Sequence, residues 1–171
     1  MEGRKNMDIS EKKSIIQKYT PQPLWGNWYL KESLGAGATG VVYRAEARRV
    51  SRTDVAAVKA KVILPSEFCR TNNDKLNSIN ERLVNQSKES EIMSKLKKCP
   101  YVVGYEEEDV IKFPSERHPE GCIFLIRMEL LQNLSDFIEK NKIRLNEATA
   151  LKVGLDIAMA VKAIHKMGYM H

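Results

Sequence analysis

The glycine-rich segment LGAGATGVVYRA, residues 34–45, constrains the fold of this chain more than any other stretch. Three glycines are followed at once by β-branched and aromatic residues: Gly35, Gly37 and Gly40, then Val41-Val42-Tyr43. Glycines at this spacing allow a backbone to approach a phosphate closely, and the residues after them favour a strand. The segment therefore predicts two strands joined by a glycine-rich turn that could cover a phosphate group.

Two other phosphate-binding turns fit this segment poorly. In a dinucleotide-binding turn the glycines open a helix, whereas strand-forming residues follow Gly40. Asp54, the nearest carboxylate for a ribose, comes too early for that motif. A Walker A loop would need Gly-Lys-Ser/Thr, which does not follow. Taken alone, the segment is also compatible with an ordinary hairpin that has glycines in its turn.

A flexible hairpin cannot neutralise phosphate charge by itself, so a cation is expected beside it. Lys59 lies in a third predicted strand at residues 54–63, where it would point beneath the hairpin. A half-buried lysine needs a partner that keeps it charged. Glu89 is suited to this role, on a long helix predicted from about Leu76 to Lys97. Glu91 is the alternative, but it lies on another face of that helix.

The other elements are predicted from apolar periodicity and from turn residues. A polar loop is expected at residues 65–75, and Asn146 is the expected N-cap of the last helix. The predicted elements are a short helix near 10–18, strands near 110–113 and 122–130, and helices at 134–140 and 146–167.

The final predicted helix is apolar over most of its circumference. Its polar residues fall within one stripe: Lys152, Asp156, Lys162 and Lys166. A helix of this kind is normally buried, and His165 is expected to be a hydrogen-bonded core residue. Little chain follows the helix. We therefore expect either a truncated part of a longer protein or a surface hidden by self-association.

In this order, these features resemble the N-terminal part of a protein kinase catalytic domain, closest to bacterial Ser/Thr kinases. Leu34 to Ala45 match the pattern LGxGxxGxVYxA, and Ala57-Val58-Lys59 matches the A-x-K of the third strand. ESEIMSKLKKCPYVV resembles the helix with the ion-pairing glutamate, FLIRMELL the strand into the hinge, and AIHKMGYMH the stretch before His-Arg-Asp. The resemblance covers about residues 25–171.

The resemblance implies an α+β fold with a kinase-like N-lobe, in which one long helix packs on a five-stranded antiparallel sheet. It also implies four parts of the chain. These are an N-terminal extension (1–24), the N-lobe (25–127), the hinge (128–133) and an incomplete start of the C-lobe with two helices (134–171).

The resemblance further implies that ATP binds together with Mg²⁺. Lys59 would pair with the α- and β-phosphates and with Glu89, and these two are the implied catalytic residues. Backbone N–H groups near Ala38 and Thr39 would contact the β- and γ-phosphates. The implied ATP-binding residues are Leu34, Gly35, Gly37, Ala38, Thr39, Gly40, Val42, Ala57, Lys59, Met128, Glu129 and Leu131.

Five of these residues would form the adenine pocket. Val42 and Ala57 would form its apolar roof, and Met128 would be the gatekeeper beside it. Glu129 would offer its carbonyl to adenine, and Leu131 its backbone groups.

The implied activity is transfer of the ATP γ-phosphate to Ser and Thr hydroxyls of protein substrates. The family's Asp of His-Arg-Asp, a following Asn and the Asp of Asp-Phe-Gly would lie beyond His171. We therefore expect the 171-residue chain alone to be inactive and to contain no Mg²⁺ ligand. The alternative is a non-catalytic, pseudokinase-like module for nucleotide binding or protein interaction.

Composition argues against several other classes of protein. The net charge is +6, but the basic residues are scattered in runs no longer than two, so nucleic acid is not an expected partner. The three cysteines and three histidines show no metal-binding spacing. A polar N-terminus and the lack of long apolar runs predict a cytoplasmic protein without a membrane segment.

Overall fold

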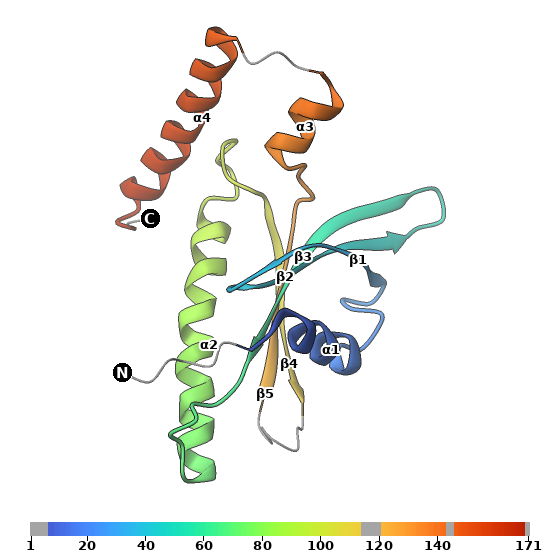
Figure 1. Cartoon of the computed structure of the whole chain (residues 1–171), viewed down its shortest axis with the longest axis vertical. Coiled ribbons are helices and arrows are strands. Elements are labelled where there is room, and N and C mark those ends of the chain that lie inside the picture. The colour runs from blue at the N-terminus through green and yellow to red at the C-terminus, as the bar shows by residue number, and fades with distance from the viewer. Residues whose placement is uncertain (1–6, 114–120, 143–145, 170–171) are drawn as a thin grey trace.

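The structure is a computed structural model that describes residues 7–113, 121–142 and 146–169 (Figure 1). Residues 114–120 and His171 lie outside the described residues. In chain order the elements are α1 (Ile9–Tyr19), β1 (Trp28–Gly37), β2 (Gly40–Arg48), β3 (Thr53–Ile63), α2 (Asn72–Lys95), β4 (Tyr105–Phe113), β5 (Gly121–Met128), α3 (Leu134–Lys140) and α4 (Glu147–Lys166).

The five strands form one antiparallel sheet in the order β1-β2-β3-β5-β4. Together with α2 alongside it, this sheet confirms the predicted α+β fold (Figure 1). β4 begins at Tyr105, earlier than the expected start near Val110. The added residues are mostly acidic and exposed, which an edge strand tolerates because one side faces water. Apolar periodicity could not reveal them.

Alternate residues of β3 serve two different cores, because successive side chains of a strand point to opposite faces. Val58 and Ala60 are fully buried in a core that also contains Ile16 of α1. Ile63 belongs to a second core, which includes Ile79 and Met93 of α2. The helices α1 and α2 therefore pack on opposite faces of the sheet.

The helix α2 begins at Asn72, so the loop predicted at residues 65–75 is too long at its C-terminal end. A capping box sets this start. The Thr71 Oγ1 accepts from the Asp74 N–H at 3.1 Å, and the Asp74 carboxylate accepts from the Thr71 N–H at 3.0 Å. The pattern T-x-x-D is visible in the sequence, but the apolar spacing that predicts a helix begins only at Leu76.

The segment before residue 25 is anchored to the sheet. Ile16 and Leu24 keep only 1% and 2% of their surface exposed. Both belong to the core on the side of the sheet where α1 packs. The Tyr19 ring stacks on Phe113 with centroids 4.9 Å apart. The domain boundary at residue 24 stays a prediction, but this segment packs as part of the sheet's core.

The helices α3 and α4 begin and end within a residue of their predicted bounds. The Asn146 Oδ1 accepts from the Thr149 N–H at 2.9 Å, as expected of an N-cap. Within the described part of the chain neither helix has a buried residue. The expectation that His165 is a core residue is wrong, because its side chain is exposed on a helix that lacks a covering layer.

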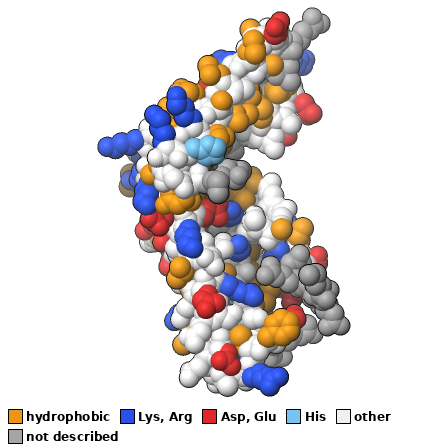
Figure 2. All heavy atoms as spheres, turned by 90° about the vertical axis from the view of Figure 1, so that its left-hand side faces the viewer, with side chains coloured by type: hydrophobic (Ala, Val, Ile, Leu, Met, Phe, Trp, Pro, Cys, Tyr) orange, Lys and Arg blue, Asp and Glu red, His pale blue; other side chains and the backbone are white. Residues whose placement is uncertain are grey.

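Several large apolar side chains of α4 are open to solvent. Leu151 is 67% exposed, Leu155 is 62% exposed and Ile157 is 59% exposed. Hydrophobic side chains gather over the upper part of the molecule, where α4 lies (Figure 2). No helix among the described residues is long and apolar enough to span a bilayer.

Candidate functional site

The glycine-rich segment forms a hairpin. β1 ends at Gly37, β2 begins at Gly40, and Ala38 and Thr39 form the turn between these paired residues. The segment therefore leads from strand to strand, unlike a dinucleotide-binding turn.

Of the three described glycines in this hairpin, only Gly40 has a positive φ, at +137°. A Cβ atom there would lie 2.5 Å from the Ala60 carbonyl oxygen, so close packing against β3 requires glycine. Gly35 and Gly37 differ, because a Cβ at either would meet no heavy atom within 4 Å. Their backbone is open to a ligand.

Lys59 and Glu89 lie in direct contact. The Lys59 Nζ is 2.6 Å from the Glu89 Oε1, and the two side chains are 19% and 43% exposed. Glu91, the alternative partner, instead pairs with Lys95 along the exposed side of α2. The structure thus brings together one lysine from β3 and one carboxylate from α2.

Strand register places further predicted residues beside Lys59. Val42 of β2 is directly opposite Lys59, so both side chains project from the same face of the sheet. Ala57 shares that face because it is two residues from Lys59 on the same strand. Met128, the last residue of β5, is opposite Ala57. An apolar surface therefore adjoins the ammonium group.

A second lysine of β3 also reaches α2. The Lys61 Nζ donates to the Gln86 Oε1 at 2.6 Å. Burial lowers the pKa of Lys61, and the positive charge of Lys59 lowers it further. Two ammonium groups on one face of β3 give this surface a positive character suited to a polyanion.

The segment after β5 is tied to the start of β4. The Glu129 N–H donates to the Gly104 carbonyl at 2.8 Å, and the Glu129 carboxylate accepts from the Gly104 N–H at 3.3 Å. Leu131 and Leu34 are 58% and 48% exposed, so both remain accessible from solvent.

One contact to the glycine hairpin comes from a residue that the sequence analysis did not select. The Lys12 Nζ of α1 donates to the carbonyl oxygens of Gly37 and Ala38 at 3.3 and 3.4 Å. A single lysine on a polar helix carries no motif, so only the packing of α1 could reveal it.

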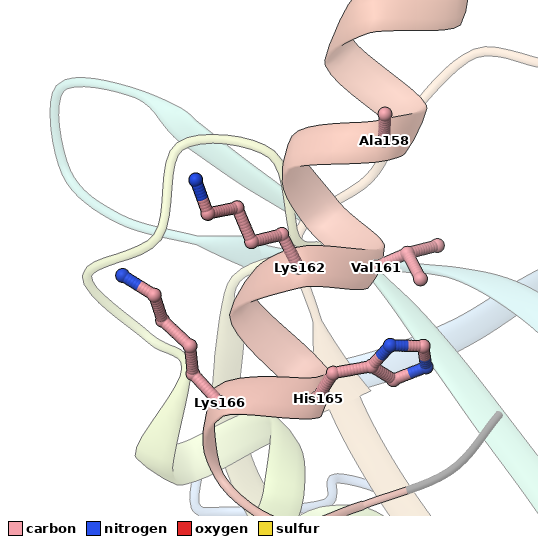
Figure 3. A pocket seen from close by; sticks show the side chains of 5 residues that line it. All are labelled: Ala158, Val161, Lys162, His165 and Lys166. Carbon is pink, nitrogen blue, oxygen red and sulfur yellow. The ribbon is translucent and has the colours of Figure 1, made fainter.

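A separate hollow of about 630 Å³ lies along α4. Val161 and His165 project to one side of that helix, and Lys162 and Lys166 to the other (Figure 3). All its lining residues belong to α4, so it contains none of the residues predicted to bind nucleotide. Among the described residues, no three His, Cys, Asp or Glu side chains gather as a metal site.

Comparison with known protein families identifies a match for most of the chain. The model of the family described as protein tyrosine and serine/threonine kinase matches residues 29–171. Apart from Trp28, the first residue of β1, the match covers the strands of the sheet and the helices α2, α3 and α4. A search of curated proteins finds no match.

Proposed function

The chain belongs to the protein tyrosine and serine/threonine kinase family, and from this premise we propose that it binds ATP beneath its glycine hairpin. In the complete protein, the bound ATP would donate its γ-phosphate to Ser and Thr hydroxyls of protein substrates. Family membership supports phosphate transfer to proteins in general. The 2.6 Å contact between Lys59 and Glu89 is the observation that carries the ATP-binding part of the proposal.

Lys59 would hold the α- and β-phosphates. Its side chain is mostly buried, and Glu89 fixes the position of the ammonium group while balancing its charge. A phosphate chain is a polyanion, and Lys61 adds a second positive charge on the same strand. This fit between charge and ligand favours a nucleotide with several phosphates over a nucleoside.

The hairpin and the sheet would hold the two ends of the nucleotide. The open backbone at Gly35 and Gly37 suits close approach of the phosphates, with N–H groups at Ala38 and Thr39 as donors. Leu34, Val42, Ala57 and Met128 would enclose the adenine end, with backbone groups of Glu129 and Leu131 as its hydrogen-bonding partners.

Mg²⁺ accompanies ATP in this family generally. We assign it no ligand among the described residues, since the Asn and Asp that hold Mg²⁺ in the family have no counterpart among them. The proposal therefore gives the described residues only the binding of the nucleotide.

The 171-residue chain by itself would bind ATP without transferring phosphate. No aspartate in its sequence stands in a His-Arg-Asp or Asp-Phe-Gly context, and the reaction needs both carboxylates. The second candidate function is a pseudokinase-like module that binds nucleotide or a protein partner without catalysis.

Two experiments test this proposal. Calorimetric titration of the chain with ATP and with adenosine should give tighter binding of ATP, and equal affinities would contradict the phosphate site. Incubation of the complete gene product with labelled ATP and a mixed protein substrate should give phosphoserine and phosphothreonine. Phosphotyrosine would contradict the Ser/Thr assignment, and binding without transfer would favour the second function.

Three further expectations stay predictions. They are the likeness to bacterial Ser/Thr kinases, a cytoplasmic location, and self-association through the exposed side chains of α4. Sedimentation of the wild type and of Leu155→Glu would test the last of these. A wild-type monomer would contradict it.

A further inference from the structure

The N-terminal helix α1 reaches the glycine hairpin through one side chain. The half-buried Lys12 Nζ donates to two successive carbonyl oxygens, those of Gly37 and Ala38, at 3.3 and 3.4 Å. These oxygens belong to the turn that joins β1 to β2. A single ammonium group therefore holds two consecutive peptide groups of the turn.

The position of α1 is itself well fixed. Ile16 is 1% exposed in the core between α1 and the sheet, and the Tyr19 ring stacks on Phe113. Asp8 caps the start of the helix by accepting from the Ser10 N–H. Lys12 is thus carried on a rigid helix, one turn before a buried anchor, and not on a mobile tail.

The contact of Lys12 with the two carbonyl oxygens also determines the direction of the N–H groups in the same peptide units. In a planar trans peptide the C=O and N–H bonds point in opposite directions. The carbonyl of Gly37 shares its peptide group with the N–H of Ala38, and the carbonyl of Ala38 shares its group with the N–H of Thr39. When Lys12 draws both oxygens toward itself, both N–H groups point away from it.

Lys12 belongs to the helix α1 and Lys59 to the strand β3, and these two elements bring their side chains toward the hairpin from different faces of the sheet. Lys12 is carried by α1, which packs in the core around Val58 and Ala60. Lys59 faces α2 on the other side, where it contacts Glu89. The N–H groups that Lys12 turns away from itself are the two proposed to contact the β- and γ-phosphates.

We propose that Lys12 is a positioning residue that orients the Ala38 and Thr39 amides toward the phosphates of the nucleotide. This inference rests on the proposed function, since it names a residue that acts on the same site. Lys12 would not touch the nucleotide. It would act through the turn, so its removal should affect ligands that carry phosphates and spare those that do not.

The binding test compares Lys12→Met with two matched variants. Lys12→Met keeps the apolar stem and a good helix former but removes the ammonium group. We expect it to weaken ATP binding by about threefold to tenfold, as loss of an ordinary hydrogen bond would, because Lys12 acts only through the turn, and to leave adenosine binding unchanged. Lys12→Arg should retain most of the ATP affinity. Lys13→Met, which removes the neighbouring charge from the same helix, should behave as wild type.

A second measurement needs no nucleotide. ¹⁵N relaxation of the ligand-free chain should show greater motion at Ala38 and Thr39 in Lys12→Met than in the wild type or in Lys13→Met. Unchanged relaxation at both amides would overturn the inference. So would unchanged ATP affinity in Lys12→Met when Lys59→Met loses ATP, and that result would leave the proposed function intact. Altered relaxation in a chain that binds no ATP would support the contact and refute the proposed function instead.

Discussion

The Lys59 Nζ lies 2.6 Å from the Glu89 Oε1, although 30 residues separate them in the chain. The side chains are 19% and 43% exposed, so the pair sits at the boundary between core and solvent. Partly exposed ion pairs contribute little to stability, because water screens the charges. The contact therefore matters mainly for where it holds the lysine, and predictions about it concern ligand binding.

Removal of the Lys59 charge should weaken ATP binding. We expect Lys59→Met to lower ATP affinity by at least about tenfold, because a charge-assisted contact to phosphate is lost, with little change in Tm. Isothermal titration calorimetry measures the affinity. Lys61→Met is the comparison variant and should lower the affinity less, since Lys61 lies on the same face of β3 but donates to Gln86. Equal losses in the two variants would contradict a specific role for Lys59.

Glu89 and Glu91 of α2 should differ sharply in their effect on ATP binding. Glu89→Gln should weaken ATP binding by about threefold or more, because Lys59 loses the charge that fixes its position. Glu91→Gln should leave the affinity unchanged, since Glu91 pairs with Lys95 away from β3. Isothermal titration calorimetry with ATP measures both affinities. An effect of Glu91→Gln as large as that of Glu89→Gln would show that the helix acts only through its overall charge.

Two glycines of the hairpin should differ in their tolerance of a methyl group. Gly40→Ala should destabilise the chain by about 1–3 kcal/mol or more, because the positive φ and the contact with the Ala60 carbonyl both oppose a Cβ. Gly35→Ala should not lower stability, since a Cβ there meets no atom within 4 Å. Urea unfolding monitored by circular dichroism gives both values. Equal stabilities would refute the close packing of Gly40 on β3.

The three cysteines should react differently with iodoacetamide. Burial raises the pKa of the Cys122 thiol to about 11, and its side chain is 1% exposed. At pH 8 the native protein should therefore be alkylated at the half-buried Cys69 and Cys99 but not at Cys122. Mass spectrometry of peptides locates the labels, and denatured protein should be labelled at all three positions. Rapid native labelling of Cys122 would contradict its place in the core.

The start of α2 should respond to acid through Asp74. Hydrogen bonds from the Thr71 side chain and backbone lower the pKa of Asp74 below its ordinary value of 3.8. A lowered folded-state pKa means that this carboxylate stabilises the protein above about pH 4 and loses that effect as pH falls through the lowered pKa.

The variant Asp74→Ala tests this expectation. It should be less stable than wild type at pH 6, and the difference should shrink at pH 2, as measured by urea unfolding. Glu81→Ala, an exposed carboxylate farther along α2, is the control. A constant difference between wild type and Asp74→Ala at both pH values would contradict the capping role.

Local patterns predicted most of the elements. The hairpin of β1 and β2, the strand β3 and the helices α1, α3 and α4 all carry clear periodicity or turn residues. The predicted starts of two elements were wrong, because polar residues and not apolar ones determine where these elements begin. α2 starts at the capping box of Thr71 and Asp74, and β4 starts with the acidic, exposed residues after Tyr105. Apolar spacing has no signal at such positions.

By itself, the sequence determined the glycine hairpin, the order of strands and helices, and the family, because these depend on turn chemistry and periodicity between near neighbours. Only the tertiary structure decided that Glu89 and not Glu91 contacts Lys59, that Gly40 is required by Ala60, and that Lys12 reaches the hairpin. Each of these depends on how one helix or strand packs on another. That packing is set by the whole core, so no short segment can specify it.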